Sequence, residues 1–245
     1  NYVDPDASNF QPTALAKVVC DTLPKHVSND LVEFEFTATL EKDLDKISDG
    51  KLPYKDLLSD FWRDFKKHLD KMTDLERSEI LNDLAAVFRW TAKLNMHEGI
   101  ANHFSVCASD SNEDFYINGT GAHFSNIKAS DLVLVEQKNI EEIKKNPSIV
   151  DPTAINIHSA IHKKAPHARC ILHIHSKYAT ALSTLKDPTL PPLDQNTMRF
   201  YNRVAVLSDF GGLGFEEEAD KMAACIGNNK VMLLANHGIL TTGQT

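Results

Sequence analysis

The sequence lacks the features that mark several classes of protein. No two cysteines are separated by only two residues, which argues against a zinc site built from cysteines. No apolar run approaches the roughly 18 residues of a membrane span, and no basic segment precedes an apolar one as in a signal peptide. Positive charge is not in excess, because 26 Lys and Arg face 34 Asp and Glu, for a net charge of -8. This balance argues against DNA binding by general electrostatics.

Cysteine is also scarce, and its placement bears on the compartment. The four cysteines are Cys20, Cys107, Cys170 and Cys225. They are widely spaced and mostly lie in apolar surroundings, which is typical of reduced, buried thiols and predicts a cytoplasmic protein.

The length and composition are those of a folded, soluble protein. The chain has 245 residues, of which 42% are hydrophobic and 24% are charged, so one large or two smaller domains can bury a sizeable core. It begins at Asn1 and ends at Thr245, soon after a conspicuous histidine. We expect both ends to be cut, with a further helix after the last residue.

The segment that organises the sequence is an apolar run, 170–176, that contains His173 and His175. On a β-strand, alternate side chains share a face and lie about 6.6 Å apart, so both histidines can face one ion while Leu172 and Ile174 face the core. A third histidine, His237, ends another apolar run. Three imidazoles are typical of a catalytic divalent-metal site. The alternative is a set of partly buried strand histidines held by backbone hydrogen bonds.

Apolar periodicity predicts helices alternating with strands after residue 72, which indicates an α/β fold. Strands are expected near 103–106, 115–118, 131–135, 170–175, 204–206 and 231–235, and helices near 73–94, 152–164, 176–182 and 216–226. On the helix that begins after Asp151, His158 and His162 are four residues apart and share a face. They form either a metal pair or a surface pair. The glycines around Thr120 form either an anion-binding loop or an ordinary hairpin turn.

Residues 1–71 predict a small all-α segment. We expect a helix opening at 11–19, a second helix capped by Thr37 and stopped by Gly50, and a third from about 54 to 71. Thr73 and Glu76 then form a capping-box pattern that predicts a new helix. The predicted domains are therefore 1–71 and 72–245, interpreted as two unrelated proteins joined either naturally or artificially.

The first of these segments resembles the end of the core of type IA bacterial DNA topoisomerases. The resemblance is carried by Asn1-Tyr2-Val3, Gln11-Pro12-Thr13, Phe36-Thr37-Ala38, Leu40-Glu41, Leu44-Asp45-Lys46-Ile47 and Gly50-Lys51. It departs at Ala16, where the family usually has Gly, and at Thr39, where it usually has Met. No acidic Toprim segment and no nucleophilic-tyrosine motif is present, so strand passage is not expected and DNA is an unlikely partner.

The second segment, from about 73 to 245, resembles the class II aldolase/adducin family. The motifs are Glu98-Gly99, Asn102-His103-Phe104-Ser105, Gly119-Thr120-Gly121, Ala129-Ser130-Asp131-Leu132, Asp151-Pro152-Thr153 with His158, His173-Ile174-His175, and Asn236-His237-Gly238-Ile239-Leu240 with Gly243. The resemblance implies a mostly antiparallel sheet flanked by helices and a homotetramer. It also implies a metal held by His173, His175 and His237, usually Zn²⁺ and sometimes Mn²⁺. The substrate's phosphate or carboxylate would be held by Asn102, Thr120, Gly121 and Thr153.

One position departs from the aldolases of that family. They carry a catalytic Glu four residues before the helix histidine, where this chain has Ala154. Aldol cleavage needs a base, whereas the loss of CO₂ does not, so the departure favours a decarboxylase. His158 or His162 could then donate the proton to carbon, with a purely structural helix pair as the alternative.

These observations predict a metal-dependent lyase that cleaves a C–C bond of a small carboxylated or phosphorylated substrate through a metal-stabilised enolate. A second hypothesis keeps aldolase activity with another base. A third is a metal-binding or adducin-like interaction module without turnover, and a fourth is a DNA-binding topoisomerase fragment. No membrane association is expected.

Overall fold

The computed structural model describes residues 13, 16–17, 34–109, 111–211 and 214–244. The helix expected from Gln11 falls largely outside these residues, as does Cys20. Within the described ranges, no helix combines the length and the apolar character that crossing a membrane requires. Contacts divide the chain into two units, Asn1–Arg77 and Ser78–Thr245, and each is described by itself.

The first unit contains α3 (Phe34–Ser48) and the beginning of α4 (Tyr54–Lys93). Thr37, expected as a cap, lies inside α3 instead. The predicted new helix at Thr73 was also wrong, because α4 is one continuous helix of 40 residues. The sequence from 54 to 93 contains no Pro or Gly, so propagation of the existing helix outweighs a local capping pattern.

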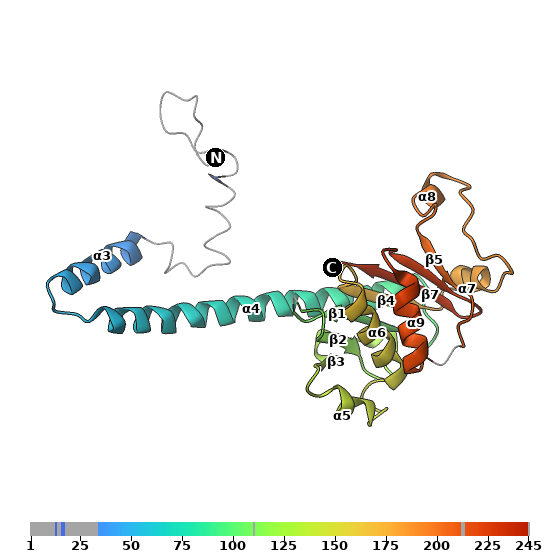
Figure 1. Ribbon diagram of the computed structural model, residues 1–245, viewed down its shortest axis with the longest axis horizontal. Helices are drawn as coiled ribbons and strands as arrows, with labels where there is room; N and C mark the ends of the chain where they lie inside the picture. Colours follow the sequence, from blue (N-terminus) through green and yellow to red (C-terminus); the bar gives the residue numbers. More distant parts are fainter. Residues whose placement is uncertain (1–12, 14–15, 18–33, 110, 212–213, 245) are drawn as a thin grey trace. The chain divides into compact units, whose positions relative to one another are not determined.

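The second unit is built on a seven-stranded sheet of order β3-β2-β1-β4-β7-β6-β5 (Figure 1). Its strands are β1 (His103–Cys107), β2 (Phe115–Asn118), β3 (Leu132–Val135), β4 (Cys170–Ile174), β5 (Val204–Leu207), β6 (Val231–Leu234) and β7 (Gly238–Gly243). Neighbours pair antiparallel except β5 and β6, which are parallel. The mixed, mostly antiparallel sheet confirms the predicted α/β class.

The remaining helices surround this sheet. They are η1 (Phe124–Asn126), η2 (Ala129–Asp131), α5 (Ile140–Lys144), α6 (Pro152–Lys164), α7 (Lys177–Ser183), α8 (Gln195–Met198) and α9 (Glu216–Ile226). Helix α5 and strand β7 were not predicted from the sequence.

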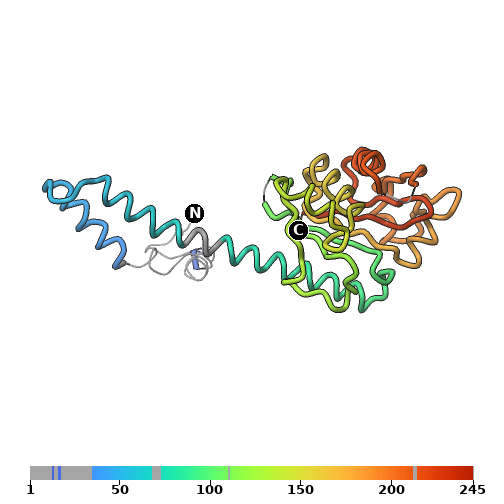
Figure 2. The backbone as a smooth tube through the Cα atoms, turned by 90° about the horizontal axis from the view of Figure 1, so that it is seen from below, coloured from blue at the N-terminus to red at the C-terminus, as the bar shows by residue number. Residues whose placement is uncertain are grey.

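Both faces of the sheet are covered, and the alternation along β4 decides which residue faces which layer. Helices α6 and α9 lie side by side (Figure 2) and cover one face. Ile171 joins their apolar core. On the other face, Leu172 and Ile174 pack against a cluster with the α4 residue Phe88. The predicted inward orientation of Leu172 and Ile174 is confirmed, and His173 is left on the α6 face.

Candidate metal centre

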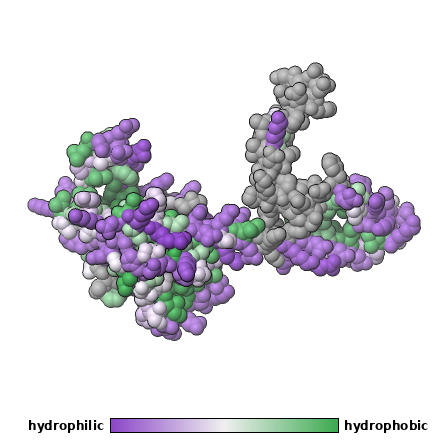
Figure 3. Space-filling view, turned by 180° about the vertical axis from the view of Figure 1, so that it is seen from behind, coloured by the Kyte–Doolittle hydropathy of each residue, from purple (hydrophilic) through white to green (hydrophobic). Residues whose placement is uncertain are grey.

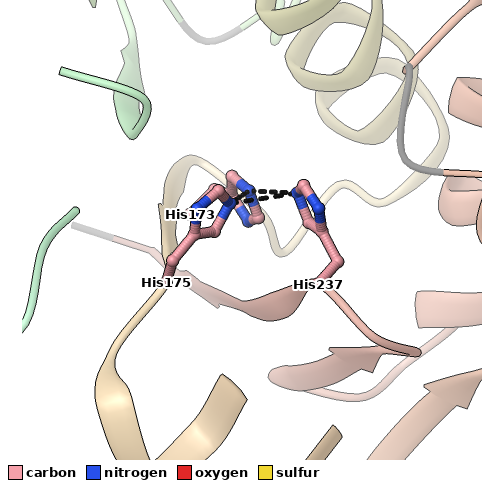
Figure 4. Close-up of side chains that lie close together, drawn as sticks. All are labelled: His173, His175 and His237. Atoms are coloured by element: carbon pink, nitrogen blue, oxygen red, sulfur yellow. Dashed lines mark hydrogen bonds between the residues drawn. The ribbon is translucent and has the colours of Figure 1, made fainter. Parts of the chain in front are cut away.

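Three histidines converge where β4 ends and β6 turns into β7. The Nε2 atom of His173 lies 3.0 Å from that of His175 and 3.1 Å from that of His237, and the last two are 3.0 Å apart. Figure 4 shows the three rings turned toward a common point. We call this group the histidine triad. The structure thus brings together the three predicted metal ligands.

The position of His237 depends on the residues before and after it, Asn236 and Gly238. Asn236 has a left-handed backbone with φ 54°, which Asn tolerates better than most residues. A Cβ on Gly238 would lie 2.7 Å from the carbonyl oxygen of Ile174 and 2.8 Å from Cδ2 of His175. Glycine therefore lets β7 approach β4 closely enough to place His237 beside His175.

The hydrogen bonds around the triad fix which nitrogens carry protons. His173 Nδ1 lies 3.1 Å from the carbonyl oxygen of Ile239, and His175 Nδ1 lies 2.6 Å from a carboxylate oxygen of Glu98. Both oxygens only accept, so both Nδ1 atoms donate and both Nε2 atoms carry lone pairs. Two facing lone pairs at 3.0 Å repel each other unless a cation or a proton lies between them.

A divalent cation fits this donor set. Three nitrogens bound at about 2.0–2.1 Å on a tetrahedral ion lie about 3.3 Å apart, close to the separations in the triad. Burial holds the pKa of His173 well below its usual value. Burial, and next the charge of His175, lower the pKa of His237 to about 4. Both rings are therefore neutral near pH ~7, which is the form that binds a metal.

Asn102 lies directly beside the triad. Its Oδ1 atom accepts hydrogen bonds from the backbone N–H groups of Glu98, at 2.7 Å, and of His175, at 3.4 Å. The side chain is only 2% exposed, yet its Nδ2 atom has no hydrogen-bond partner among the described residues. A buried amide donor without an acceptor costs free energy, so this N–H group is available to an oxygen of a bound molecule.

The family model described as "Class II Aldolase and Adducin N-terminal domain" matches residues 82–245. The chain belongs to the class II aldolase and adducin family. The match covers the whole sheet and every residue of the triad.

Relatives and solved structures of this family carry different names. A "Putative aldolase class 2 protein" of Caulobacter vibrioides is 34% identical over 66% of this chain and 63% of its own length. "Decarboxylase NovR" of Streptomyces niveus is 30% identical over 66% of this chain and 60% of its own. The solved L-fuculose 1-phosphate aldolase of Glaciozyma antarctica has 30% identity and a TM-score of 0.61, covering 71% of this chain and 67% of that one. The chain spans about three fifths to two thirds of the length of the aldolase- and decarboxylase-named relatives it matches, and 22% of the length of a rat alpha-adducin.

The other predicted substrate-binding residues are not joined to the triad by any hydrogen bond in the part of the chain that the structure describes. Thr120 and Gly121 lie in an exposed turn after β2, where the Thr120 N–H donates to the carbonyl of Ile149 at 3.0 Å. Thr153 lies at the N-terminus of α6, and its N–H and hydroxyl both donate to Asp151, at 2.8 and 2.7 Å. Their role as substrate ligands stays a prediction.

The position that departs from the aldolases of this class II family is a core position here. Ala154 is 1% exposed and packs with Phe115, Ile117 and Ile155 under the sheet. A methyl group there provides neither a base nor a hydrogen bond.

His158 and His162 face strand β1 and not solvent, and both are fully buried. His158 Nε2 lies 2.7 Å from Nδ1 of His103, and Ser105 Oγ contacts both His158 Nδ1 and His162 Nε2. Burial, and next the charge of His103, hold the pKa of His158 well below its usual value, and burial lowers the pKa of His162 to about 4. Their role as proton donors stays a prediction.

Two residues beside these histidines were not assigned a role from the sequence. His103 and Ser105 alternate on β1, so they share the face that α6 covers. That alternation, opposite two histidines four residues apart on a helix, is the signal that would have found them. Glu98 was likewise quoted only as part of a motif, although it hydrogen-bonds to His175.

Proposed function

We propose that this chain is a metal-dependent lyase that cleaves a C–C bond of a small carboxylated or phosphorylated substrate. The observation that carries the proposal is the convergence of three Nε2 atoms within 3.1 Å, two of them fixed as lone-pair donors. His173, His175 and His237 would hold the ion. A triad of nitrogen donors with room for a further ligand suits Zn²⁺ best, with Mn²⁺ as the alternative. When bound, such an ion polarises a substrate oxygen as a Lewis acid.

The residues around the triad have separate tasks in this proposal. Asn102 donates its unpartnered Nδ2–H to a substrate oxygen and thereby orients the substrate. Glu98 holds the His175 ring in position. Thr120 and Gly121 would bind the substrate's anionic group through the Thr120 hydroxyl and the Gly121 N–H group in the loop after β2. Thr153, at the N-terminus of α6, would exchange its hydroxyl bond to Asp151 for one to the substrate. His158 and His162 would assist proton transfer through His103, the residue that lies between them and the triad.

Decarboxylation is favoured over aldol cleavage. The only carboxylate that hydrogen-bonds to a triad histidine in the described residues is Glu98, and Ala154 supplies none. Release of CO₂ requires no base, so this site meets its needs with the groups present. A relative named as a decarboxylase agrees with this choice. Aldolase activity is the second candidate, supported by the solved fuculose-phosphate aldolase of similar fold.

We also propose that the protein forms homo-oligomers, a tetramer by family resemblance. Hydrophobic surface gathers around the segment that carries α8 (Figure 3, upper left). Leu193 is 81% exposed there, and Leu190, Pro192 and Phe200 line a pocket of about 260 Å³. Contact with a second copy would cover these side chains. Light scattering coupled to size-exclusion chromatography measures the oligomer directly.

The free thiols Cys107, Cys170 and Cys225 suit a reducing compartment, in line with a cytoplasmic protein.

Metal analysis is the first test. Purified wild-type protein should contain about one transition metal ion per chain, and His175→Ala should contain almost none. Carboxylated substrates are then screened for CO₂ release and for aldehyde release, which separates the two lyase reactions. Metal without turnover would favour the adducin-like module. Absence of metal, and no uptake of added Zn²⁺ or Mn²⁺, would reject the lyase.

The resemblance of residues 1–71 to type IA topoisomerases, and the domain boundary at 71, remain separate proposals. Salt-dependent binding of single-stranded DNA by the full chain would support a DNA-binding role. No binding at low salt would end it.

A further inference from the structure

A second set of histidines lies behind the triad, in the interface between β1 and α6. His103 contacts His158, His158 contacts Ser105, and Ser105 contacts His162. The Nδ1 atom of His162 lies 2.6 Å from the carbonyl oxygen of Ala168. We call His103, His158, Ser105 and His162 the buried network. Its members are between 0% and 9% exposed, and none has a carboxylate as a hydrogen-bond partner in the described part of the chain.

The carbonyl of Ala168 sets the direction of every hydrogen bond in this network. A carbonyl oxygen only accepts, so His162 Nδ1 carries a hydrogen, and the Nε2 atom of this neutral ring carries a lone pair. The Ser105 hydroxyl must then donate to His162 Nε2, at 2.7 Å. Because a hydroxyl has one hydrogen, Ser105 can only accept from His158.

The same reasoning extends to His103. His158 Nδ1 donates to Ser105, so His158 Nε2 carries a lone pair. His103 Nδ1 must therefore carry the hydrogen in the 2.7 Å contact with His158 Nε2. Reversing the direction would set a lone pair of His162 against the lone pairs of the Ala168 carbonyl, at 2.6 Å. The network consequently has one consistent arrangement of hydrogens when its histidines are neutral.

His103 is the member of the network that borders the triad. It is paired with His173 across the sheet, and the centroids of their rings lie 4.8 Å apart. At 9% exposed it is also the only histidine of the network with accessible surface. Its Nε2 atom has no hydrogen-bond partner among the described residues, whereas its Nδ1 atom is committed to His158.

We infer that the buried network holds His103 as the Nδ1–H tautomer, so that its bare Nε2 atom accepts a hydrogen bond from a hydroxyl group of the substrate. The substrate would then be a hydroxylated carboxylate. His103 is the residue that touches the hydroxyl, whereas Ser105, His158 and His162 act on the substrate only through His103. The choice of substrate rests on the proposed function, but the tautomer does not, so the two can be tested apart.

The tautomer is read from ¹⁵N NMR of the histidine rings in the 245-residue chain, with His103→Gln used to assign the signals. We expect the wild type to show a protonated Nδ1 and an unprotonated Nε2 on His103. Ser105→Ala breaks the network, so His103 should become a mixture of tautomers. The matched control is Ser183→Ala, which removes another buried hydroxyl, whose one hydrogen bond among the described residues is to the carbonyl of Thr180. It should leave the His103 signals unchanged.

The substrate class is tested with glycolate and acetate, which differ by one hydroxyl group. Wild-type protein loaded with Zn²⁺ should bind glycolate more tightly than acetate. In Ser105→Ala the ratio of the two affinities should fall by the inverse of the fraction of His103 that keeps the Nδ1–H tautomer, about 2-fold for an even mixture. An unchanged ratio would overturn the assignment of His103 to the substrate hydroxyl.

A protonated His103 Nε2 in the wild type would overturn the inference, and this result needs no variant to fold. Metal content is measured on the same samples. If the wild type binds metal but carries the hydrogen of His103 on Nε2, only the inference about His103 is rejected. If the wild type binds no metal, the proposed function is rejected.

Discussion

The two groups of histidines differ in how their nitrogens are used. In the triad, three Nε2 atoms face one point, and the lone pairs of His173 and His175 repel each other unless a positive charge lies between them. In the buried network, every ring nitrogen except Nε2 of His103 faces a complementary partner, and the series ends on a backbone carbonyl. The same side chain is thus suited to a metal in one place and to a defined order of hydrogens in the other. In the triad the hydrogen-bond acceptors converge on one point, whereas in the buried network acceptors alternate with donors.

The largest expected effect separates the two groups by metal content. His237→Ala removes one of three converging donors and should abolish metal binding at micromolar concentrations. His162→Gln alters the buried network only and should retain about one ion per chain. Elemental analysis of both variants measures the difference. Equal metal loss in the two would contradict the division into a metal site and a structural network.

The next effect concerns acid stability and originates in the buried network. The pKa of His162 is about 4 in the folded protein, below its value in the unfolded chain. The unfolded state therefore takes up the proton first, and stability is complete above about pH 6.5 and falls as the pH drops toward about 4. Proton uptake by His162 in the unfolded state should lower the unfolding free energy by about 2 kcal/mol between about pH 7 and about pH 5. Urea unfolding at both values should show a smaller loss in His162→Gln, and an equal loss would remove His162 as the cause.

A smaller effect on Zn²⁺ affinity should follow from loss of the hydrogen bond that orients His175 in the triad. Glu98→Gln replaces the carboxylate that accepts from His175 Nδ1 at 2.6 Å, and such partners orient a ligand and raise its basicity. Zn²⁺ affinity should fall by about 10–100-fold without complete loss. Competition with a chromophoric chelator gives the constant. Glu113→Gln, on an exposed turn, is the control and should bind Zn²⁺ like the wild type. An unchanged affinity in Glu98→Gln would mean that Glu98 does not orient His175.

The smallest effect should come from the outer face of the helix that carries both network histidines. Lys164 Nζ lies 2.6 Å from a carboxylate oxygen of Asp220, in an exposed pair between α6 and α9. Lys164→Ala should change the unfolding free energy by only about 0–1 kcal/mol, because water screens the pair. If Lys164→Ala lowered the unfolding free energy as much as a substitution in the buried network, the stability of α6 would depend on its exposed face as much as on the network.

Much of the sheet could be predicted from the sequence, because buried strands are short apolar runs in which the side chains alternate between the two faces. Strand β4 was predicted with its two faces, and the three histidines of the triad were proposed together. Strand β7 was missed, since Gly238–Gly243 has only two consecutive strongly apolar residues, Ile239 and Leu240, and becomes a strand by pairing with β4 and β6. The long helix α4 was divided wrongly, because a capping pattern is effective only where the preceding helix has already ended.

What the sequence by itself determined is the set of local patterns: apolar alternation, a histidine at every second position of a strand, and a glycine where two strands meet closely. Only the tertiary structure decided which nitrogen of each histidine is free. For most of them that choice depends on distant partners, such as Glu98, which is 77 residues from His175, and Ser105, which is 53 residues from His158. A hydrogen-bond direction is a property of both partners, and the fold alone brings them together.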